Sequence, residues 1–107
     1  MGSQESLKKA RTLIESEISK NKVQVFSKTY CPYCKMAKDA LKAAGIDYNV
    51  MELDNRSDGS AIQDVLKEMT GARSVPRVFI NGKCIGGGSE TKALQVQGKL
   101  VQMVNAS

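Results

Sequence analysis

The pattern of apolar and polar positions along the chain predicts alternating helices and strands. Apolar residues recur every three or four positions in three segments, residues 6–20, 31–44 and 62–69, which is typical of amphipathic helices. Runs rich in β-branched and aromatic residues predict four strands, over residues 23–27, 48–53, 77–80 and 83–85. A last helical region is expected from Glu90 onward, with an interruption at Gly98. The expected order is therefore α-β-α-β-α-β-β-α.

Residues that favour turns and helix caps separate these segments. Asn81-Gly82 is a strong hairpin signal between the last two expected strands. Proline suits the first turn of a helix, glycine its end and serine its N-cap. These roles are predicted for Pro32, for Gly45 and Gly71, and for Ser57 and Ser89.

The order of the elements predicts the fold class. The first two strands are joined by a helix, so they should be parallel with a right-handed crossover. The last two strands should form an antiparallel hairpin. We therefore expect an α/β fold, a four-stranded mixed sheet flanked by helices, as a single domain over residues 1–107.

Composition narrows the class of protein. The chain has 107 residues and a mass of 11.6 kDa, which fits one domain. Hydrophobic residues make up 41% of the sequence, too many for a disordered tail, and no run approaches the ~20 apolar residues of a membrane span. The net charge is +5, but the basic residues are scattered and the aromatic residues that nucleic-acid readers interleave with them are few. We therefore expect neither a nucleic acid nor a membrane as partner.

The N-terminus carries no apolar segment of the kind found in secretory signal peptides. Residues 1–6 match the short myristoylation pattern M-G-x-x-x-[ST], although Met-Gly-Ser is also common in vector-derived leaders. One acyl chain would anchor the protein only marginally. We expect the protein to be cytoplasmic.

The candidate chemistry lies in the cysteines. There are three, and Cys31 and Cys34 form a C-x-x-C motif between a predicted strand and a predicted helix, a position typical of redox-active pairs. A helix N-terminus favours the thiolate form of a cysteine there, and Lys28 and Lys35 flank the site. The chain has no histidine, so a Cys-His pair is excluded. We predict Cys31 as the nucleophile and the more buried Cys34 as the resolving thiol.

Other interpretations of the cysteines remain open. A tetrahedral zinc site needs four ligands, whereas this chain offers three sulfurs and no imidazole. Cys84 lies on a predicted strand, where it is interpreted as structural, with oxidation or dimer formation as the alternative.

Two further segments each have a plain and a functional interpretation. The Val75-Pro76 pair is commonly just the start of a strand, and its local sequence favours the trans isomer. A cis bond would instead offer the Val75 backbone to a peptide lying across the site. Residues 86–90, Gly-Gly-Gly-Ser-Glu, form either a loop with a helix cap or a nest of N–H groups for a carboxylate.

Three segments form a set that is more specific than any one of them alone. They are Ser-Lys-Thr-Tyr-Cys-Pro-Tyr-Cys at 27–34, Thr-Gly-Ala-Arg-Ser-Val-Pro-Arg-Val-Phe-Ile at 70–80 and Cys-Ile-Gly-Gly-Gly-Ser-Glu at 84–90. Together they resemble the glutaredoxins of the C-P-Y-C, dithiol class, which have the thioredoxin fold. The resemblance implies a glutathione-dependent thiol-disulfide oxidoreductase that reduces protein-glutathione mixed disulfides and protein disulfides.

The resemblance also implies roles for residues that would bind glutathione. Lys28 and Gln63 would hold its glycine carboxylate, and Tyr33 would line the groove. Val75 would pair with the cysteinyl backbone, beside a cis Pro76. Further residues would meet the γ-glutamyl carboxylate or add positive charge: Ser89 and Glu90 for the first role, Arg73 and Arg77 for the second. Two positions depart from the family pattern, since many members have Asp at Glu90 and a larger residue at Gly88.

The resemblance bears on cofactors and partners as well. Relatives with Gly or Ser at the position of Pro32 bridge an iron–sulfur cluster between two subunits, so Pro32 argues against a metal here. Glutathione is the expected co-substrate, glutathionylated or disulfide-containing proteins are the expected partners, and a monomer is expected. Two alternatives are a thioredoxin-type enzyme reduced by a flavoprotein and a non-catalytic metal-binding or cluster-carrying module. Tyr30 and Pro32-Tyr33 stand where the first alternative usually has Trp and Gly-Pro.

Overall fold

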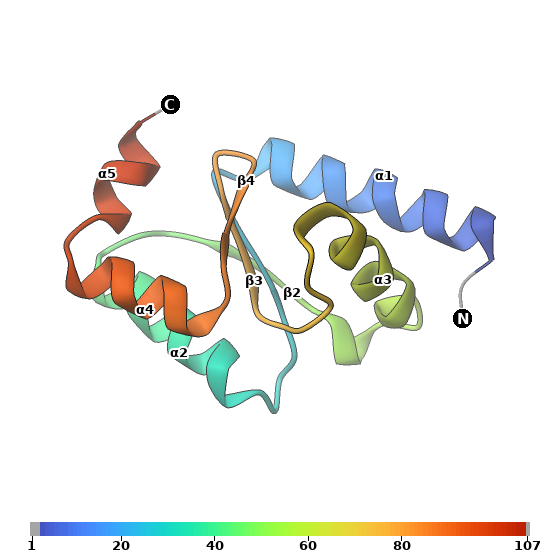
Figure 1. The fold of residues 1–107 in the computed structure, drawn as a ribbon, viewed down its shortest axis with the longest axis horizontal. Helices are drawn as coiled ribbons and strands as arrows, with labels where there is room; N and C mark the ends of the chain where they lie inside the picture. The colour runs from blue at the N-terminus through green and yellow to red at the C-terminus, as the bar shows by residue number, and fades with distance from the viewer. Residues whose placement is uncertain (1–2, 107) are drawn as a thin grey trace.

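The structure, a computed structural model, describes residues 3–106. It confirms the expected element order and adds a short 3-10 helix, η1, and a separate final helix, α5 (Figure 1). The elements are α1 Gln4–Lys20, β1 Val23–Ser27, α2 Pro32–Ala43, β2 Asn49–Glu52, η1 Leu53–Asn55, α3 Gly59–Thr70, β3 Arg77–Ile80, β4 Lys83–Gly86, α4 Gly88–Val96 and α5 Leu100–Asn105.

The four strands form one mixed sheet in the order β2-β1-β3-β4. Strand β1 runs parallel to β2, with Ser27 opposite Glu52, and antiparallel to β3, with Val25 opposite Val78. Strands β3 and β4 form the expected hairpin. Its turn residues, Asn81 and Gly82, both have positive φ, the conformation that an Asn-Gly hairpin turn favours. The predicted parallel pair and antiparallel hairpin are therefore both confirmed.

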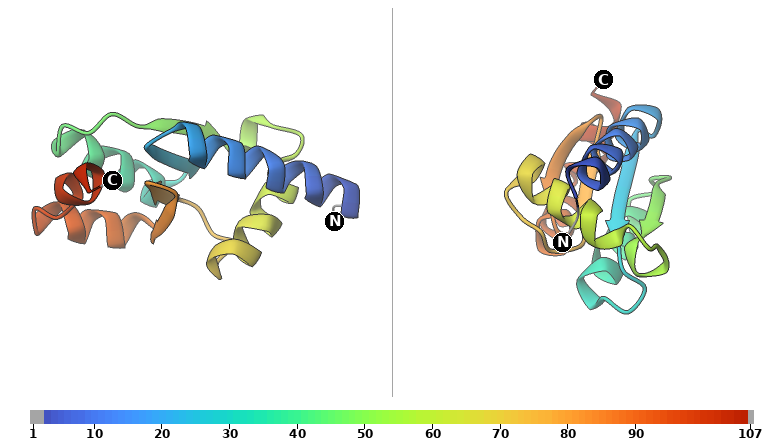
Figure 2. Two further views of the ribbon diagram at one scale, coloured as in Figure 1. Left: turned by 90° about the horizontal axis from the view of Figure 1, so that it is seen from above. Right: turned by 90° about the vertical axis from the view of Figure 1, so that its right-hand side faces the viewer.

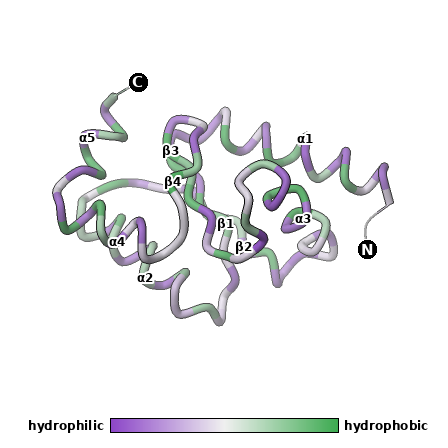
Figure 3. Tube along the Cα trace, viewed as in Figure 1, coloured by the Kyte–Doolittle hydropathy of each residue, from purple (hydrophilic) through white to green (hydrophobic). Residues whose placement is uncertain are grey.

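Helices cover both faces of the sheet. Helices α1 and α3 lie together on one face, and α2 and α4 lie together on the other (Figures 1 and 2). On the first face Phe26 and Phe79 meet edge to face, with ring centroids 5.7 Å apart, among the apolar residues of α1 and α3. On the second face Val25 and Leu41 belong to a separate apolar cluster that continues to α5. The amphipathic pattern of the helices is visible along α1, where hydrophilic and hydrophobic turns alternate (Figure 3).

Strand β1 lies inside the sheet, and all five of its residues are buried. An interior strand covered on both faces has no solvent side, so its polar residues need partners within the protein. The Gln24 side chain accepts hydrogen bonds from Asn21 Nδ2 at 3.0 Å and Asn49 Nδ2 at 2.8 Å. This fully buried strand ends at Ser27, and a short loop over residues 28–30 leads from it to the C-x-x-C motif.

Three predicted boundaries are wrong. Strand β2 covers residues 49–52 rather than 48–53, because the chain turns at Leu53 and buries that side chain in η1. Asp58, not Ser57, is the N-cap of α3. Gly87, not Ser89, is the N-cap of α4: the Glu90 carboxylate accepts the Gly87 N–H at 2.6 Å, which places Ser89 inside the first turn.

The C-terminal region follows the expected interruption. Helix α4 ends at Val96 and α5 begins at Leu100, with Gly98 between them in the left-handed region at φ 70°. Helix α1 is the longest helix that the structure describes, and like every other helix within residues 3–106 it lacks the length and apolarity to cross a membrane.

The start of α3 generates a prediction about stability. A Cβ on Gly59 would lie inside van der Waals distance of the Leu53 carbonyl oxygen, so the backbone of η1 or of α3 would have to move. We expect Gly59→Ala to lower the free energy of unfolding by ~1–3 kcal/mol, the usual range for overpacking, although alanine favours a helix by ~1 kcal/mol.

Chemical denaturation of the purified variants measures this effect. Lys67→Ala, an exposed substitution in the same helix, is the control and should change the free energy of unfolding by no more than about 0.5 kcal/mol. A Gly59→Ala variant as stable as the unmodified chain would contradict the contact with Leu53.

Candidate active site

Cys31 lies where strand β1 meets helix α2. It is the N-cap residue of α2, and its Sγ accepts the backbone N–H of Cys34 at 3.2 Å. The first N–H groups of a helix have no partner within it and carry partial positive charge, which favours a thiolate at this position. The side chain is half-buried, so it remains open to solvent. The structure thus places Cys31 where an accessible nucleophilic thiolate is stabilised.

Cys34 has a different environment, one turn further into α2. Its side chain is fully buried, as the sequence predicts, and its Sγ accepts the backbone N–H of Lys28 at 3.5 Å. Burial, followed by the interaction with Cys31, raises the pKa of the Cys34 thiol from its ordinary value of 9.0 to about 11. Cys34 therefore keeps its proton at neutral pH. The two cysteines are chemically distinct: Cys31 is half-buried and open to solvent, and Cys34 is fully buried and protonated.

The Val75–Pro76 segment faces the cysteines. The peptide bond between these residues is cis, as the resemblance implies and against the local preference for trans. The Val75 carbonyl oxygen lies 3.7 Å from Cys31 Sγ and accepts a hydrogen bond from it when the thiol is protonated. The next carbonyl, that of Pro76, accepts Arg77 Nε at 2.9 Å. The segment from 75 to 77 is thus fixed directly beside Cys31.

The glycines before α4 complete this side of the site. A Cβ on Gly88 would come within 2.5 Å of the Tyr33 carbonyl oxygen, and one on Gly87 within 2.9 Å of Arg77 Nη2. A larger residue at 88 would therefore push the start of α4 away from α2. This close approach accounts for the departure at Gly88 and brings the N-terminus of α4 next to Tyr33.

The predicted glutathione-binding residues fall into two groups. Val75 lies against Cys31 and is followed by Pro76, and Tyr33 and Arg77 lie beside Gly88 and Gly87, whereas Gln63 and Arg73 meet each other at α3. The buried Gln63 donates its amide to the Arg73 carbonyl at 3.0 Å. The Arg73 guanidinium turns onto α3, where it bonds Asp64 and Ser60, each at 2.9 Å. Lys28 is half-buried in the loop before Cys31, and Ser89 and Glu90 are exposed.

Lys35 contributes less positive charge than its sequence position suggests. Its Nζ forms an ion pair with Asp39 at 2.7 Å, along the exposed side of α2. The same contact lowers the pKa of the Asp39 carboxyl and raises the pKa of Lys35. The Lys35 charge is therefore directed away from Cys31.

Two polar pairs near the site are not predicted from the sequence. Lys38 and Glu52 form a largely buried ion pair of 2.6 Å that joins α2 to the end of β2, and Glu52 Oε1 is buried without a hydrogen-bond partner among the described residues. Asp54, interpreted from the sequence only as part of a polar turn, accepts hydrogen bonds from Thr29. Nothing in the sequence pattern links these positions, because each pair is far apart along the chain.

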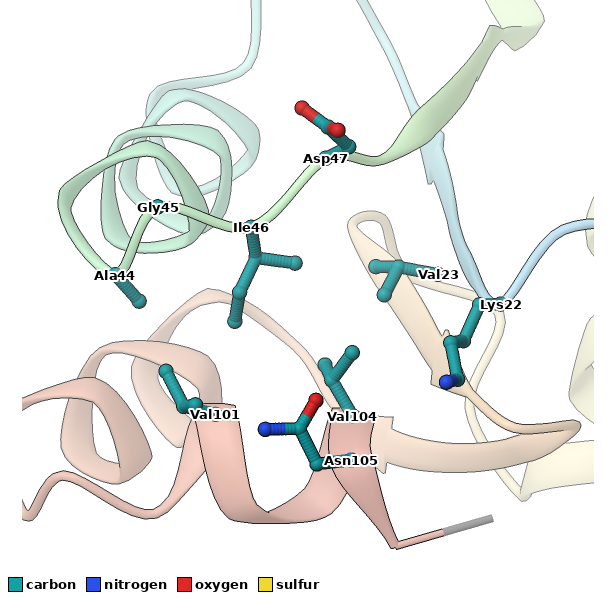
Figure 4. A pocket seen from close by; sticks show the side chains of 9 residues that line it. All are labelled: Lys22, Val23, Ala44, Gly45, Ile46, Asp47, Val101, Val104 and Asn105. Carbon is teal, nitrogen blue, oxygen red and sulfur yellow. The ribbon is translucent and has the colours of Figure 1, made fainter.

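A surface cavity lies elsewhere in the structure. It measures about 310 Å³ and is bordered by Val23, Ile46, Val104 and neighbouring residues (Figure 4). Val23 is the first residue of β1, whereas the cysteines follow its last residue, so this cavity is at the opposite end of the sheet. This cavity is therefore separate from the cysteines. Among residues 3–106 no cluster of three or more acidic or cysteine side chains could hold a metal ion.

The contrast between the cysteines predicts selective alkylation. Treatment with iodoacetamide at pH 8 should modify Cys31 and leave Cys34 unmodified, because the Cys34 thiol is buried and its pKa is about 11. The folded-state pKa lies above the ordinary value, so the stability gained by burying the neutral thiol is present below pH 9 and lost as the pH rises through about 11.

Peptide mass spectrometry after quenching measures the modification at each cysteine. The same reaction in denaturant is the control, in which both should react. Equal modification of Cys31 and Cys34 in the folded protein would contradict the assignment.

Comparison with known proteins agrees with this geometry. The sequence model of the Glutaredoxin family matches residues 23–85. A glutaredoxin of Ricinus communis is 53% identical over 95 residues, which cover 89% of this chain and 93% of the relative. Glutaredoxin-C2 of Arabidopsis thaliana is 48% identical over 99 residues, which cover 92% and 86%.

Solved structures of similar proteins share the architecture. The crystal structure of a buckwheat glutaredoxin–glutathione complex superposes with a TM-score of 0.92 at 44% identity, covering 96% of this chain and 94% of that one. Oxidized glutaredoxin 2 from Chlamydomonas reinhardtii superposes with a TM-score of 0.87 at 49% identity, covering 92% of each chain. The C-x-x-C motif, the four-stranded mixed sheet and these similarities lead to one conclusion: the chain belongs to the glutaredoxin family, has the thioredoxin fold and carries a dithiol C-x-x-C motif.

Proposed function

We propose that this glutaredoxin reduces protein-glutathione mixed disulfides and protein disulfides, with Cys31 as nucleophile and Cys34 as resolving thiol. The observation that carries the proposal is the contrast between the cysteines. Cys31 caps α2 and is open to solvent, whereas Cys34 is fully buried and keeps its proton because its pKa is about 11. An exposed thiolate can attack an incoming disulfide, which a buried thiol cannot reach.

Deglutathionylation requires only Cys31. Its thiolate attacks the glutathione sulfur of a protein-glutathione disulfide, the protein thiolate leaves, and Cys31 is left in a mixed disulfide with glutathione. A second glutathione thiolate attacks the glutathione sulfur of this mixed disulfide. Glutathione disulfide forms and the Cys31 thiolate is restored, so one free glutathione is consumed for each protein thiol released.

Reduction of a protein disulfide also uses Cys34. Cys31 attacks one sulfur of the disulfide and forms a mixed disulfide with the protein. Cys34 then loses its proton to solvent and attacks Cys31 Sγ, which releases the second protein thiolate and leaves a Cys31–Cys34 disulfide. Two glutathione molecules reduce this disulfide. The Cys34 N–H that meets Cys31 Sγ at 3.2 Å keeps the two residues close enough for the second step.

Glutathione would lie across the surface between α2, the Val75 segment and the start of α4. The buckwheat relative was crystallised as a glutathione complex, which supports the same ligand here. In the proposed pose the Val75 backbone pairs with the cysteinyl unit beside Pro76, and Tyr33 lines the groove. The N–H groups at the start of α4, at Ser89 and Glu90, receive the γ-glutamyl carboxylate.

The glycine carboxylate is assigned to the other side of the cysteines. In the proposed pose Lys28 contacts it directly, with Gln63. The Gln63 amide nitrogen donates one of its two hydrogens to the Arg73 carbonyl, so its second N–H is the donor that it can offer to the carboxylate. Arg73 and Arg77 add positive charge near the anionic tripeptide, although Asp64 offsets that of Arg73.

We further propose that the protein works as a cytoplasmic monomer without a metal. The motif supports the last point, since Pro32 stands between the cysteines at the first turn of α2. A visible absorption band with stoichiometric iron or zinc in freshly isolated protein would instead favour the cluster-carrying alternative. Glutathione and glutathionylated or disulfide-containing proteins are the proposed partners.

Cysteine substitutions test the proposed mechanism. We expect Cys31→Ser to lose more than 100-fold in glutathione-dependent reduction of a glutathionylated peptide, because no other thiol is both exposed and placed at a helix N-terminus. Cys34→Ser should retain at least half of this activity, yet lose the reduction of a protein disulfide that needs a resolving thiol. A coupled assay that follows glutathione disulfide measures both reactions.

Cys84→Ser is the matched control. Cys84 is half-buried, packs against the α1/α3 side of the core and makes no contact with the C-x-x-C motif, so both activities should stay within about twofold. Retained activity in Cys31→Ser would overturn the proposed mechanism.

A further inference from the structure

The loop that leads from β1 to the C-x-x-C motif is hydrogen-bonded to the carboxylate of Asp54, which lies outside the loop. Asp54 Oδ1 accepts the backbone N–H of Thr29 at 3.0 Å, and Asp54 Oδ2 accepts the Thr29 hydroxyl. One side chain therefore takes both hydrogen-bond donors of a single residue, although the two residues lie 25 positions apart. Hydrogen bonds to an ionised carboxylate are stronger than those between neutral groups.

The same loop is bonded to both active-site cysteines. The Lys28 carbonyl accepts the Cys31 N–H at 3.3 Å, and the Lys28 N–H donates to Cys34 Sγ at 3.5 Å. Lys28 directly precedes Thr29, so a shift of Thr29 changes the direction of the Lys28 peptide groups. The Lys28 carbonyl that accepts the Cys31 N–H thus belongs to the same peptide group as the Thr29 N–H that donates to Asp54, and the Lys28 N–H that donates to Cys34 belongs to the preceding peptide group.

Asp54 itself has a rigid support. It lies in η1, directly after the buried Leu53, whose carbonyl packs against Gly59 at the start of α3. The bonds from Thr29 lower the pKa of the Asp54 carboxyl, and the positive charge of Lys28 acts in the same direction. The carboxylate is therefore ionised at neutral pH and held against the loop that leads into α2.

We propose that Asp54 is a positioning residue for the dithiol, acting through Thr29 on the Lys28 peptide groups that bond Cys31 and Cys34. Asp54 touches neither cysteine, so its effect is indirect. The inference deepens the proposed function, since it assigns to Asp54 control of the reactivity on which that function rests. Thr29 is then the residue that links Asp54 to the Lys28 peptide groups.

The test measures the reactivity of the cysteines in the reduced, folded protein. We expect Asp54→Ala to slow the alkylation of Cys31 by iodoacetamide at pH 7 about 3- to 10-fold and to move its pH profile to higher pH. The low background alkylation of Cys34 at pH 9 should slow more than twofold, because the Lys28 N–H that lowers the pKa of this thiol is no longer fixed. Asp54→Asn, which keeps an oxygen to accept the Thr29 N–H, should lie between Asp54→Ala and the unmodified chain.

Asp58→Ala is the matched control. Asp58 lies in the same turn and also accepts charge-assisted hydrogen bonds, at 2.8 and 3.1 Å, but its partner is Arg56 and not the active-site loop. In Asp58→Ala the rate of Cys31 alkylation should stay within twofold of that in the unmodified chain, and its pH profile should not move. Thr29→Val should reproduce part of the Asp54→Ala effect. Thr29→Ser, which keeps the hydroxyl, should react at the rate of the unmodified chain.

The outcomes separate a positioning role from a purely structural one. Circular dichroism establishes which variants are folded. If Asp54→Ala is unfolded, the alkylation of Asp54→Asn and Thr29→Val is compared with that of the unmodified chain instead. Lower thermal stability with an unchanged alkylation pH profile in the folded Asp54 and Thr29 variants would overturn the proposal. Alkylation needs no glutathione, so an unmodified chain that fails to reduce a glutathionylated peptide would overturn the proposed function and leave this comparison intact.

Discussion

The cap that Cys31 forms on helix α2 is the interaction on which the site depends. The Sγ accepts the Cys34 N–H at the first turn, in the place where Ser, Thr, Asp or Asn usually caps a helix. A sulfur at this position meets the positive end of the helix, and it does so without a histidine anywhere in the sequence. Strand β1, buried over its whole length and paired on both sides, fixes the position of this junction.

The second cysteine follows from the same helix geometry. A residue three positions after the cap lies on the first turn, and in α2 this position faces the sheet, where the apolar residues Ala37 and Leu41 continue the buried stripe. Cys34 is therefore buried for the same reason that α2 packs on the sheet. Burial raises the pKa of its thiol to about 11, so the helix that stabilises one thiolate keeps the other sulfur protonated. The positions of Cys31 and Cys34 on α2 therefore account for their different reactivities.

The sequence predicts the elements of this fold well because their periodicities are local. The parallel pair and the hairpin follow from connection lengths and turn residues, whereas the strand order β2-β1-β3-β4 is given only by the structure. Caps are harder to place: Gly87 replaces Ser89 because the Glu90 side chain reaches back to it, a contact that the residue types alone do not distinguish. The site shows the same limit. The C-x-x-C chemistry is visible in the sequence, whereas the Asp54–Thr29 and Lys38–Glu52 pairs join residues brought together only by the sheet.

The contacts that hold the site share a feature that explains why so few charged side chains are needed. Asp54 binds the Thr29 backbone, Gly88 abuts the Tyr33 backbone and Glu90 binds the Gly87 backbone. Gln63 and Arg77 likewise bind the carbonyls of Arg73 and Pro76. Peptide dipoles at the start of α2 contribute positive field at Cys31, whereas the charge of Lys35 is paired with Asp39. A site built from peptide groups depends on the path of the backbone, and side chains that fix the backbone then control reactivity without touching sulfur.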